Sequence, residues 1–404
     1  MSSYLTSRRK PDCTGCEACV QACALHALQM VEDEDGFRYP KVDHAKCVHC
    51  NACLRVCPME NPLPFHAEER VAFGGYAKDA IIRQGSTSGG AFSVISASWC
   101  RGEYAIFGAV ATGLDVVHEC VTDIREIDRF RKSKYLQSRV GDSYCRVREF
   151  LREGRRVLFS GTPCQIAGLR TFLGKDADHV NLLTVEVVCE GVPTPHYIRK
   201  FAAWLGQRHG GEVIDIDYRF KDGRRWDFQV MQASLQSPTR GTFKLKRDRW
   251  FNPFWSIWLQ HLMSRPSCYE CPFARPERGA DITLGDLWGV HLYCPDLYGR
   301  NGGSSLVVAN TAKGRETLDL ARAQMLGREL DFVTALRYQG PMRGHIVQNP
   351  QRAAFMQDLA AMPYEELCHK WAKKPTLKLL FQKYVWGNRQ KVWLWNLLNR
   401  DHLK

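Results

Sequence analysis

The sequence lacks any long hydrophobic run. No segment of its 404 residues reaches the roughly 18 uninterrupted apolar residues that a membrane-spanning helix needs. The opening MSSYLTSRRKPDC also lacks the apolar stretch of a secretory signal peptide. We therefore expect a cytoplasmic protein, in which most thiols stay reduced.

Several binding motifs are missing as well. There is no GxGxxG, no GxxxxGK[ST], and no HxxxH or HExxH among the 13 histidines, which argues against a Rossmann dinucleotide site, a P-loop and a zinc-protease site. The formal net charge is +13, which favours acidic partners. Because no nucleic-acid motif accompanies that charge, we expect no nucleic-acid partner.

Cysteine is abundant, with 17 residues in a chain too long for a typical disulfide scaffold. Eight of them form two quartets with the same spacing, CxxCxxCxxxC, at Cys13, Cys16, Cys19 and Cys23, and at Cys47, Cys50, Cys53 and Cys57. In two-cluster ferredoxins the fourth cysteine of such a run ligates the other cluster. The spacing therefore predicts one [4Fe–4S] cluster on Cys13, Cys16, Cys19 and Cys57, and another on Cys47, Cys50, Cys53 and Cys23. Zinc is the rival, but its usual sites are separated CxxC pairs.

The rest of the chain alternates predicted strands and helices. Residues 28–31 and 37–40 flank a polar turn and predict a hairpin. Strands are expected at 73–77, 105–111, 156–160 and 182–189, and helices at 89–99, 144–152 and 165–173. Residues 212–250 are more strand-like, and the chain becomes helical after Gly340. This alternation favours an α/β core.

Four further cysteines predict a third cluster. Cys164 follows Thr162 and Pro163, a natural cap and first helical residue, so the helix dipole favours its thiolate. Cys189 ends an apolar strand, and Cys268 and Cys271 form a CxxC pair. The residues alone leave two alternatives. The four cysteines form a four-thiolate cage, or Cys164 and Cys189 are simply small apolar residues buried in the core.

Several ordered strings resemble the beta subunit of coenzyme F420 hydrogenase/dehydrogenase. They are GSTSGGAF at 85–92, KSKYLQS at 132–138, GTPCQIAGL at 161–169, RFKDG at 219–223 and CYECPFARPERGADITLGD at 268–286. The resemblance covers about residues 70–330 and implies FAD beside a [4Fe–4S] cluster on Cys164, Cys189, Cys268 and Cys271. This sequence departs from the simplest members by its N-terminal cysteine quartets and its basic tail, so the resemblance does not establish the deazaflavin as substrate.

The resemblance also implies where FAD binds. Ser86, Thr87, Ser88, Gly89 and Gly90 precede a predicted helix, whose N-terminus suits a pyrophosphate. Within the family pattern, Lys134 and Tyr135 are expected at the flavin or its phosphates, although a basic run such as 129–139 is more often a solvated face. His196 is a candidate proton donor at the pocket mouth, with a surface or capping histidine as the commoner alternative. Asp286 either lines the flavin site or, as we favour, caps a turn.

These observations predict four regions. They are a ferredoxin-like α+β domain (1–66), an α/β flavin-binding core made of an FAD-binding region (67–155) and a region with the third cluster (156–340), and a helical basic extension (341–404). The leading hypothesis is an iron–sulfur flavoprotein oxidoreductase acting on an organic substrate or deazaflavin-type coenzyme. The alternative is an electron-transfer subunit that feeds a partner hydrogenase or dehydrogenase. If the chain is such a subunit, we expect a redox partner protein. If it is an enzyme with its own substrate, we expect a small-molecule electron acceptor.

The C-terminal tail is basic and rich in tryptophan. From Lys373 to Lys404 it holds eight Lys/Arg residues and one acid, Asp401. Leu377, Leu380, Phe381, Tyr384 and Val385 fall at helical spacing, continued after Gly387–Asn388 by Val392, Trp395 and Leu398. Such a helix either docks on the protein's own core, the commoner outcome, or lies on an anionic membrane surface.

Overall fold

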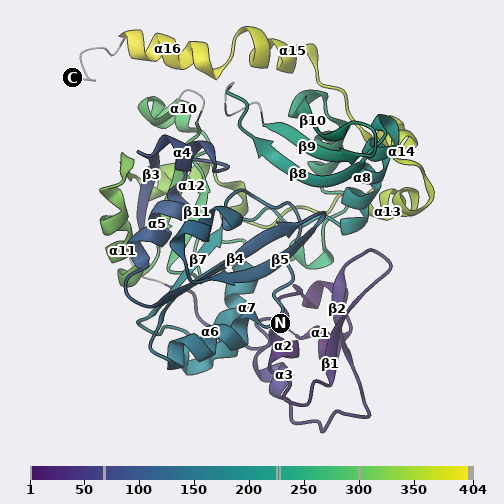
Figure 1. Ribbon diagram of the computed structural model, residues 1–404, viewed down its shortest axis with the longest axis vertical. Coiled ribbons are helices and arrows are strands. Elements are labelled where there is room, and N and C mark those ends of the chain that lie inside the picture. Colours follow the sequence, from purple (N-terminus) through teal and green to yellow (C-terminus); the bar gives the residue numbers. More distant parts are fainter. Residues whose placement is uncertain (1, 67–69, 224–225, 227–228, 299–301, 399–404) are drawn as a thin grey trace.

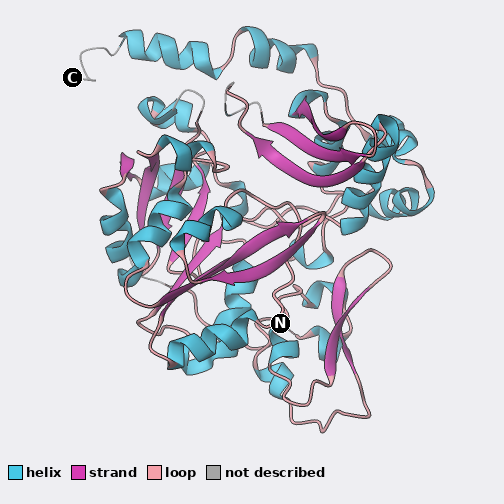
Figure 2. Cartoon of the chain, viewed as in Figure 1, coloured by secondary structure: helices cyan, strands magenta, loops and turns pink. Residues whose placement is uncertain are grey.

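The computed structural model describes residues 2–66, 70–223, 226, 229–298 and 302–398. It folds as a mixed α/β protein around a large central sheet, with helices on both faces (Figures 1 and 2). Residues 67–69, at the start of the predicted FAD-binding region, and residues 399–404 of the predicted tail lie outside the described part. No helix in the described part is long and apolar enough to cross a membrane.

The N-terminal region is built from short elements around a hairpin. Its helices and strands are α1 (Tyr4–Ser7), η1 (Lys10–Asp12), α2 (Ala18–Gln21), β1 (Leu28–Glu32), β2 (Arg38–Val42) and α3 (Ala52–Arg55). The strands β1 and β2 pair antiparallel, with Leu28 opposite Val42. This confirms the predicted hairpin.

The central sheet has eight strands in the order β13-β3-β12-β11-β7-β6-β4-β5. Its elements are β3 (Val71–Ala77), α4 (Ala80–Gln84), α5 (Ala91–Trp99), β4 (Tyr104–Thr112), β5 (Asp115–Val121), η2 (Ile124–Phe130), α6 (Ser143–Arg152), β6 (Arg156–Gly161), α7 (Pro163–Leu173), η3 (Gly174–Asp176), β7 (Leu182–Val187), β11 (Ile282–Asp286), α10 (Val290–Tyr293), η7 (Pro295–Tyr298), β12 (Ser305–Ala309), α11 (Ala312–Arg322), β13 (Met325–Leu330) and α12 (Phe332–Arg337). Strands β4, β6, β7 and β11 run parallel. The boundary expected at residue 155 falls inside this sheet, because β4 pairs with β6.

Alternating side chains of the parallel strands build two cores. On β4 and β6, Ile106 and Leu158 pack under α5 and α11. Phe107 and Phe159 face the opposite way and pack under α6 and α7. This period-two alternation gives each strand two buried faces, as expected for strands covered by helices on both sides.

A second, three-stranded sheet forms its own unit with the C-terminal helices. Its elements are α8 (Pro195–His209), β8 (Glu212–Phe220), β9 (Val230–Ser237), β10 (Gly241–Asp248), η5 (Arg249–Phe251), α9 (Pro253–Trp258), α13 (Arg352–Ala361) and α14 (Tyr364–Trp371). Phe355, Leu367 and Trp371 are buried in the same cluster as Phe254 and Leu235. The predicted extension therefore divides into a docked part, α13–α14, and a tail made of α15 (Leu377–Leu380), the π-helix η9 (Phe381–Val385) and α16 (Asn388–Leu398).

Candidate metal centres and flavin cavity

The two N-terminal cysteine quartets adopt the same local backbone. In each repeat a residue with positive φ, Glu17 or Asn51, directly follows the second cysteine and starts a one-turn helix that carries the third. Few L-residues adopt this conformation, and it lets the chain turn its cysteines toward one side. The repeat seen in the sequence is thus a repeat of structure.

The thiols group across the two repeats. Burial raises the pKa of the Cys16 thiol, and the charges of Cys57 and Cys13 raise it further. For Cys53, burial also raises the pKa, and so do the charges of Cys23 and Cys47. Thiol charges thus act between the two repeats, that of Cys57 on Cys16 and that of Cys23 on Cys53. The exchange of the fourth cysteine between two clusters stays a prediction from the spacing, and iron bound there would hold these thiols deprotonated.

The described residues do not form a site for a single ion, since no three His, Cys, Asp or Glu side chains are close enough to hold one. All 17 cysteines are free of disulfide bonds.

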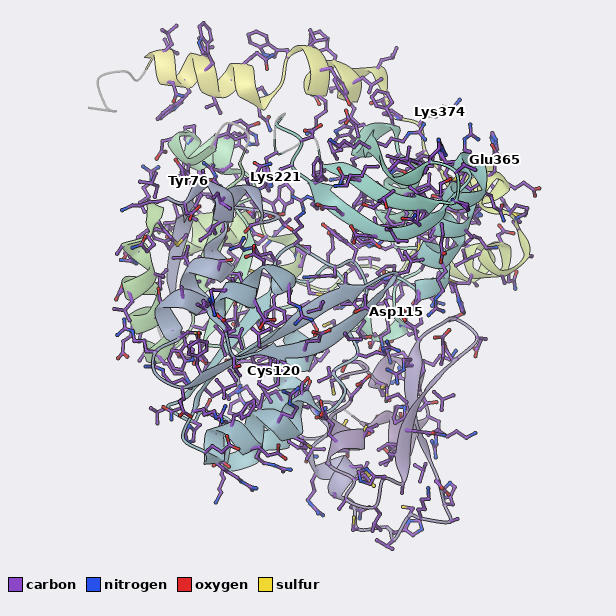
Figure 3. The ribbon with its side chains drawn as sticks, in the orientation of Figure 1. Tyr76, Asp115, Cys120, Lys221, Glu365 and Lys374 are labelled. Carbon is purple, nitrogen blue, oxygen red and sulfur yellow. The ribbon has the colours of Figure 1, made fainter. Side chains whose placement is uncertain are left out.

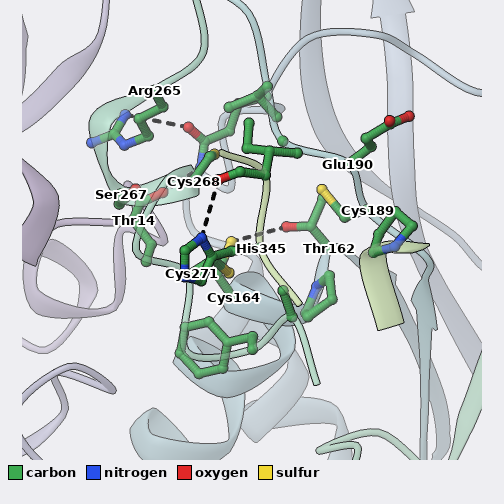
Figure 4. Close-up of a pocket in the computed structure, with 18 of the residues that line it drawn as sticks. Thr14, Thr162, Cys164, Cys189, Glu190, Arg265, Ser267, Cys268, Cys271 and His345 are labelled. Carbon is green, nitrogen blue, oxygen red and sulfur yellow. Dashed lines mark hydrogen bonds between the residues drawn. The ribbon is translucent and has the colours of Figure 1, made fainter. Parts of the chain in front are cut away.

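The other four predicted ligands surround one cavity, although they come from three distant segments (Figure 4). Cys164 lies in the first turn of α7, where Thr162 and Gln165 form a capping box and Thr162 Oγ1 lies 3.2 Å from Cys164 Sγ. Cys189 follows the end of β7, and Cys268 ends the 3₁₀ helix η6 (Pro266–Cys268). Burial raises the pKa of Cys268 to about 11 and that of Cys271 to about 12, with nearby Cys164 adding to both. The residues fit a four-thiolate cage.

A buried ion pair holds the loop that carries Cys271. Arg278 and Glu186 are each about 1% exposed at the side chain and form a salt bridge. Arg278 Nη1 also donates to the carbonyls of Phe273 and Arg275, each at 3.0 Å. Breaking such a pair leaves a buried charge uncompensated, so the CxxC loop is firmly fixed to β7.

Arg265 lies between the cage and the first quartet. It is 2% exposed and lines the cage cavity. Its Nε donates to the Cys13 carbonyl at 2.9 Å, and its Nη2 lies 3.6 Å from Cys13 Sγ. On the other side of the first quartet, Gly168 of α7 lets Cys16 approach, because an added Cβ there would lie 2.9 Å from Cys16 Cβ. The first quartet therefore lies against α7, the helix that carries Cys164 in its first turn.

A larger cavity of about 660 Å³ lies at the carboxyl ends of β6, β7 and β11. This is the edge at which open α/β sheets bind ligands, and the volume is in the range of cofactor sites. Six of the seven predicted flavin residues line it: Ser86, Thr87, Ser88, Gly90, Lys134 and Tyr135. Cys189 and Thr162 line both this cavity and the cage cavity.

Gly89 does not line the cavity. Its N–H donates to Ser305 Oγ at 2.9 Å, and an added Cβ would lie 2.5 Å from the Gly75 carbonyl oxygen. Glycine is needed here for packing against β3 and β12. A bulky residue at this position would therefore disturb the sheet, and it would not be a clean test of phosphate binding.

The loop before α5 presents its backbone to the cavity. Gly90 has φ +88° and caps α5, which has no side-chain cap, and Gly90, Ala91 and Phe92 line the cavity. Lys221 fixes the loop from behind, since its Nζ donates to the carbonyls of Arg83, Ser88 and Gly302 at 2.5 to 2.6 Å. An uncapped helix start of this kind favours an anionic group.

Cations outnumber acids along the cavity wall. The cations are Arg131, Lys132, Lys134, Arg219 and Arg249, and the acids are Glu190 and Asp286. Arg219 Nη1 donates to Asp286 Oδ2 at 3.0 Å and to the Tyr135 hydroxyl at 3.3 Å. Arg219 Nη2 and Arg249 Nε are buried and have no hydrogen-bond partner among the described residues. Burial lowers the pKa of Lys134 to about 8, and its Nζ donates to the Arg131 carbonyl at 2.7 Å. The arrangement suits a ligand with phosphate groups.

An aromatic wall closes one side of the cavity. The Tyr135 ring centroid lies 5.0 Å from that of Trp255 and 5.5 Å from that of Trp258, both edge-on. The Nε1 atoms of both tryptophans are buried, and no described residue accepts a hydrogen bond from either. Flat apolar surfaces with unsatisfied donors suit a planar ring that carries acceptors. Together with the cations and the α5 terminus, the wall fits FAD.

Two sequence candidates sit differently from expectation. Asp286 lines the cavity and pairs with Arg219, so our preferred interpretation of it as a turn cap was wrong. His196 does not line this cavity, because it packs against Gly36 of the N-terminal region. Sequence reasoning missed Arg219, Arg249, Trp255 and Trp258 as site residues. Only Arg219 carried a signal, as part of the RFKDG string.

Comparison with known proteins identifies two regions of the chain. Residues 154–328 match the family described as the C terminus of the beta subunit of coenzyme F420 hydrogenase/dehydrogenase, and residues 12–61 match the 4Fe-4S dicluster domain. The chain carries both. It is thus an iron–sulfur electron-transfer protein related to the F420 hydrogenase beta subunit, of an oxidoreductase type.

Among solved structures, the chain is similar to one from the F420-reducing [NiFe] hydrogenase complex of Methanosarcina barkeri. The sequences are 14% identical, the TM-score is 0.42, and the match covers 69% of this chain and 90% of the other. None of the curated proteins matches the chain.

Proposed function

We propose that this chain is an iron–sulfur flavoprotein oxidoreductase with three [4Fe–4S] clusters and one FAD. Its clusters exchange electrons with the flavin, which reacts with an organic substrate or a deazaflavin-type coenzyme. We also propose a cytoplasmic site of action, because the chain leaves all 17 cysteines unpaired.

The cysteine neighbours support an ordered route. The first quartet lies against the helix that carries Cys164, because Gly168 of that helix leaves room for Cys16. Arg265 lines the cage cavity and donates to the Cys13 carbonyl, so it joins the first quartet to the cage. The observation that carries the proposal is Cys189, which lines both the cage cavity and the large cavity. A cluster held there adjoins whatever occupies the large cavity.

The chain's own residues then take distinct roles. The α5 N-terminus and the unpaired nitrogens of Arg219 and Arg249 hold the phosphates. Tyr135, Trp255 and Trp258 hold the ring system and exclude water from it. When bound, FAD supplies two-electron chemistry that iron–sulfur clusters divide into single-electron steps.

The large cavity has an opening at which a substrate can enter. Lys132, Ser133 and Glu190 line it and are exposed to solvent. An open cavity favours an enzyme with its own substrate over a subunit that only feeds a partner hydrogenase or dehydrogenase. In the latter case the flavin would lie beneath a closed, flat apolar surface.

Anaerobic purification with iron, sulfide and flavin analysis tests the cofactor content. We expect about twelve irons and one FAD per chain. A screen of small-molecule reductants then follows flavin absorbance. Bleaching by one class of organic reductant supports the enzyme. Bleaching only by a protein electron donor supports the subunit, and a chain that binds no flavin contradicts both.

A further inference from the structure

The tail carries an unusual concentration of exposed apolar side chains. Ten large hydrophobic residues between 377 and 398 are exposed: Leu377, Phe381, Tyr384, Val385, Trp386, Trp393, Leu394, Trp395, Leu397 and Leu398. Leu377 is 86% and Leu398 74% exposed. Elsewhere in the described chain such residues are scattered, which is ordinary for a surface. A continuous stretch of this kind marks an interaction surface.

The tail lies across one end of the molecule (Figure 1), where α16 contacts α10 and η7 and Lys383 Nζ lies 4.9 Å from the Trp250 ring centroid. The Tyr384 hydroxyl donates to Asp248 Oδ2 at 2.9 Å, and the Tyr384 and Phe251 rings stack with centroids 5.7 Å apart. Val392 is the one large hydrophobic residue that α16 buries in the described part of the tail. The tail is thus partly docked on the core, as one alternative expected, but this docking leaves most side chains of the apolar stripe exposed.

The charges within the tail itself are all positive. Lys373, Lys374, Lys378 and Lys391 are exposed, and the sequence from 372 to 398 contains no acid. The neighbouring strand β10 adds exposed Lys244, Lys246 and Arg247. A second copy of the same surface would be repelled by this charge. The surface is complementary to one that is both apolar and negatively charged.

We propose that residues 373–398 bind an anionic lipid surface. The tryptophans and leucines enter the interface, where amphipathic rings are favoured, and the lysines contact the acidic headgroups. Figure 3 shows side chains of the segment projecting into open space on its outer side, which leaves room for such a surface. The proposal does not depend on the redox function, because no described tail residue lines the cysteine or flavin cavities.

Co-sedimentation with vesicles tests this proposal on the full chain. The vesicles are phosphatidylcholine alone, or phosphatidylcholine and phosphatidylglycerol in equal parts, at low and high salt. We expect sedimentation with the anionic vesicles that falls at high salt, since surface charge interactions are screened. A chain ending at Lys374 should lose it.

Point variants keep the test valid if the truncated chain misfolds. Lys378→Glu with Lys391→Glu should weaken binding to anionic vesicles about tenfold or more. Lys41→Glu with Lys175→Glu makes the same charge change at exposed sites away from the tail and should leave binding unchanged. Trp386→Ser with Trp393→Ser should remove a blue shift of tryptophan fluorescence that anionic vesicles induce.

Three results would overturn the proposal. They are absence of binding by the full chain to anionic vesicles, equal sedimentation of the full and truncated chains, and equal weakening by the two lysine pairs. Tail-dependent self-association seen by light scattering, without vesicle binding, would instead assign the surface to a second copy of the chain.

Discussion

The two ends of this chain are attached to the core in opposite ways. The N-terminal region inserts polar groups into buried positions: Glu17 Oε2 accepts hydrogen bonds from the N–H groups of Val140 and Gly141, at 3.0 and 2.9 Å. Gln21 Oε1 accepts from the N–H groups of Tyr144 and Cys145. The tail instead leaves its largest side chains exposed. The first end is therefore fixed relative to the cage and suits electron transfer within the chain, whereas the second is available to something outside it.

The largest expected effect comes from removing the cage. Cys268→Ser with Cys271→Ser should remove about four of about twelve irons, since two thiolate ligands are lost from one cluster. Iron and sulfide analysis measures it. The dicluster domain should keep its irons, because its eight cysteines are untouched. A parent with about eight irons, unchanged in the variant, would show that the cage binds no cluster.

FAD binding in the large cavity should depend on Arg219, which lies in neither the N-terminal region nor the tail. Arg219→Leu removes a buried cation with an unpaired nitrogen and should weaken FAD binding by about 10- to 100-fold, as expected for a lost charged hydrogen bond of about 1.5–3 kcal/mol. Fluorescence titration of the flavin-free protein measures the affinity. Arg219→Lys should lose less. Arg55→Leu, at an exposed site in the dicluster domain, is the control. An equal loss of FAD affinity in both leucine variants would show that Arg219 does not contact the flavin.

The fixed attachment of the N-terminal region should weaken when its buried carboxylate is removed. Glu17→Ala leaves the buried N–H of Val140 without its acceptor and removes the acceptor of the exposed Gly141 N–H, which costs about 1–3 kcal/mol. The measurements are amide hydrogen exchange at Val140 and Gly141 and the thermal unfolding midpoint. Glu34→Ala removes an exposed carboxylate paired with Lys10 and should cost about 1 kcal/mol or less. Equal shifts in the two variants would contradict the fixed attachment.

The smallest expected effect is that of the tail on the redox centres. A chain ending at Lys374 should retain the parent's iron and flavin content, because the described tail lines neither cavity. Loss of either cofactor in a folded truncated chain would show that the tail supports the core after all.

Local chemistry made much of this architecture predictable. Thr162 and Pro163 marked the start of α7, and the structure begins that helix at Pro163. Apolar runs alternating with helical segments predicted the parallel strands, since each such strand is covered by helices on both faces. The cysteine spacing likewise predicted the 4Fe-4S dicluster domain, because ligands three residues apart are confined to one loop.

Long-range placement was less accessible. The salt bridge between Arg219 and Asp286 joins β8 to the end of β11, and no local sequence pattern predicts that these two residues are in contact. Trp255 and Trp258 read as ordinary core residues of α9, yet they also form a cavity wall. For the tail, periodicity revealed an apolar stripe but could not show whether anything covers it.

The proposed function depends on electron transfer from the dicluster domain through the cage to the flavin. Stopped-flow mixing with a reduced ferredoxin, a donor too large to enter the cavity, tests this directly by following flavin absorbance under anaerobic conditions. We expect fast bleaching in the parent and bleaching slowed at least tenfold in flavin-loaded Cys268→Ser/Cys271→Ser, because the connecting cluster is missing. Equal bleaching rates in the two proteins would contradict this route.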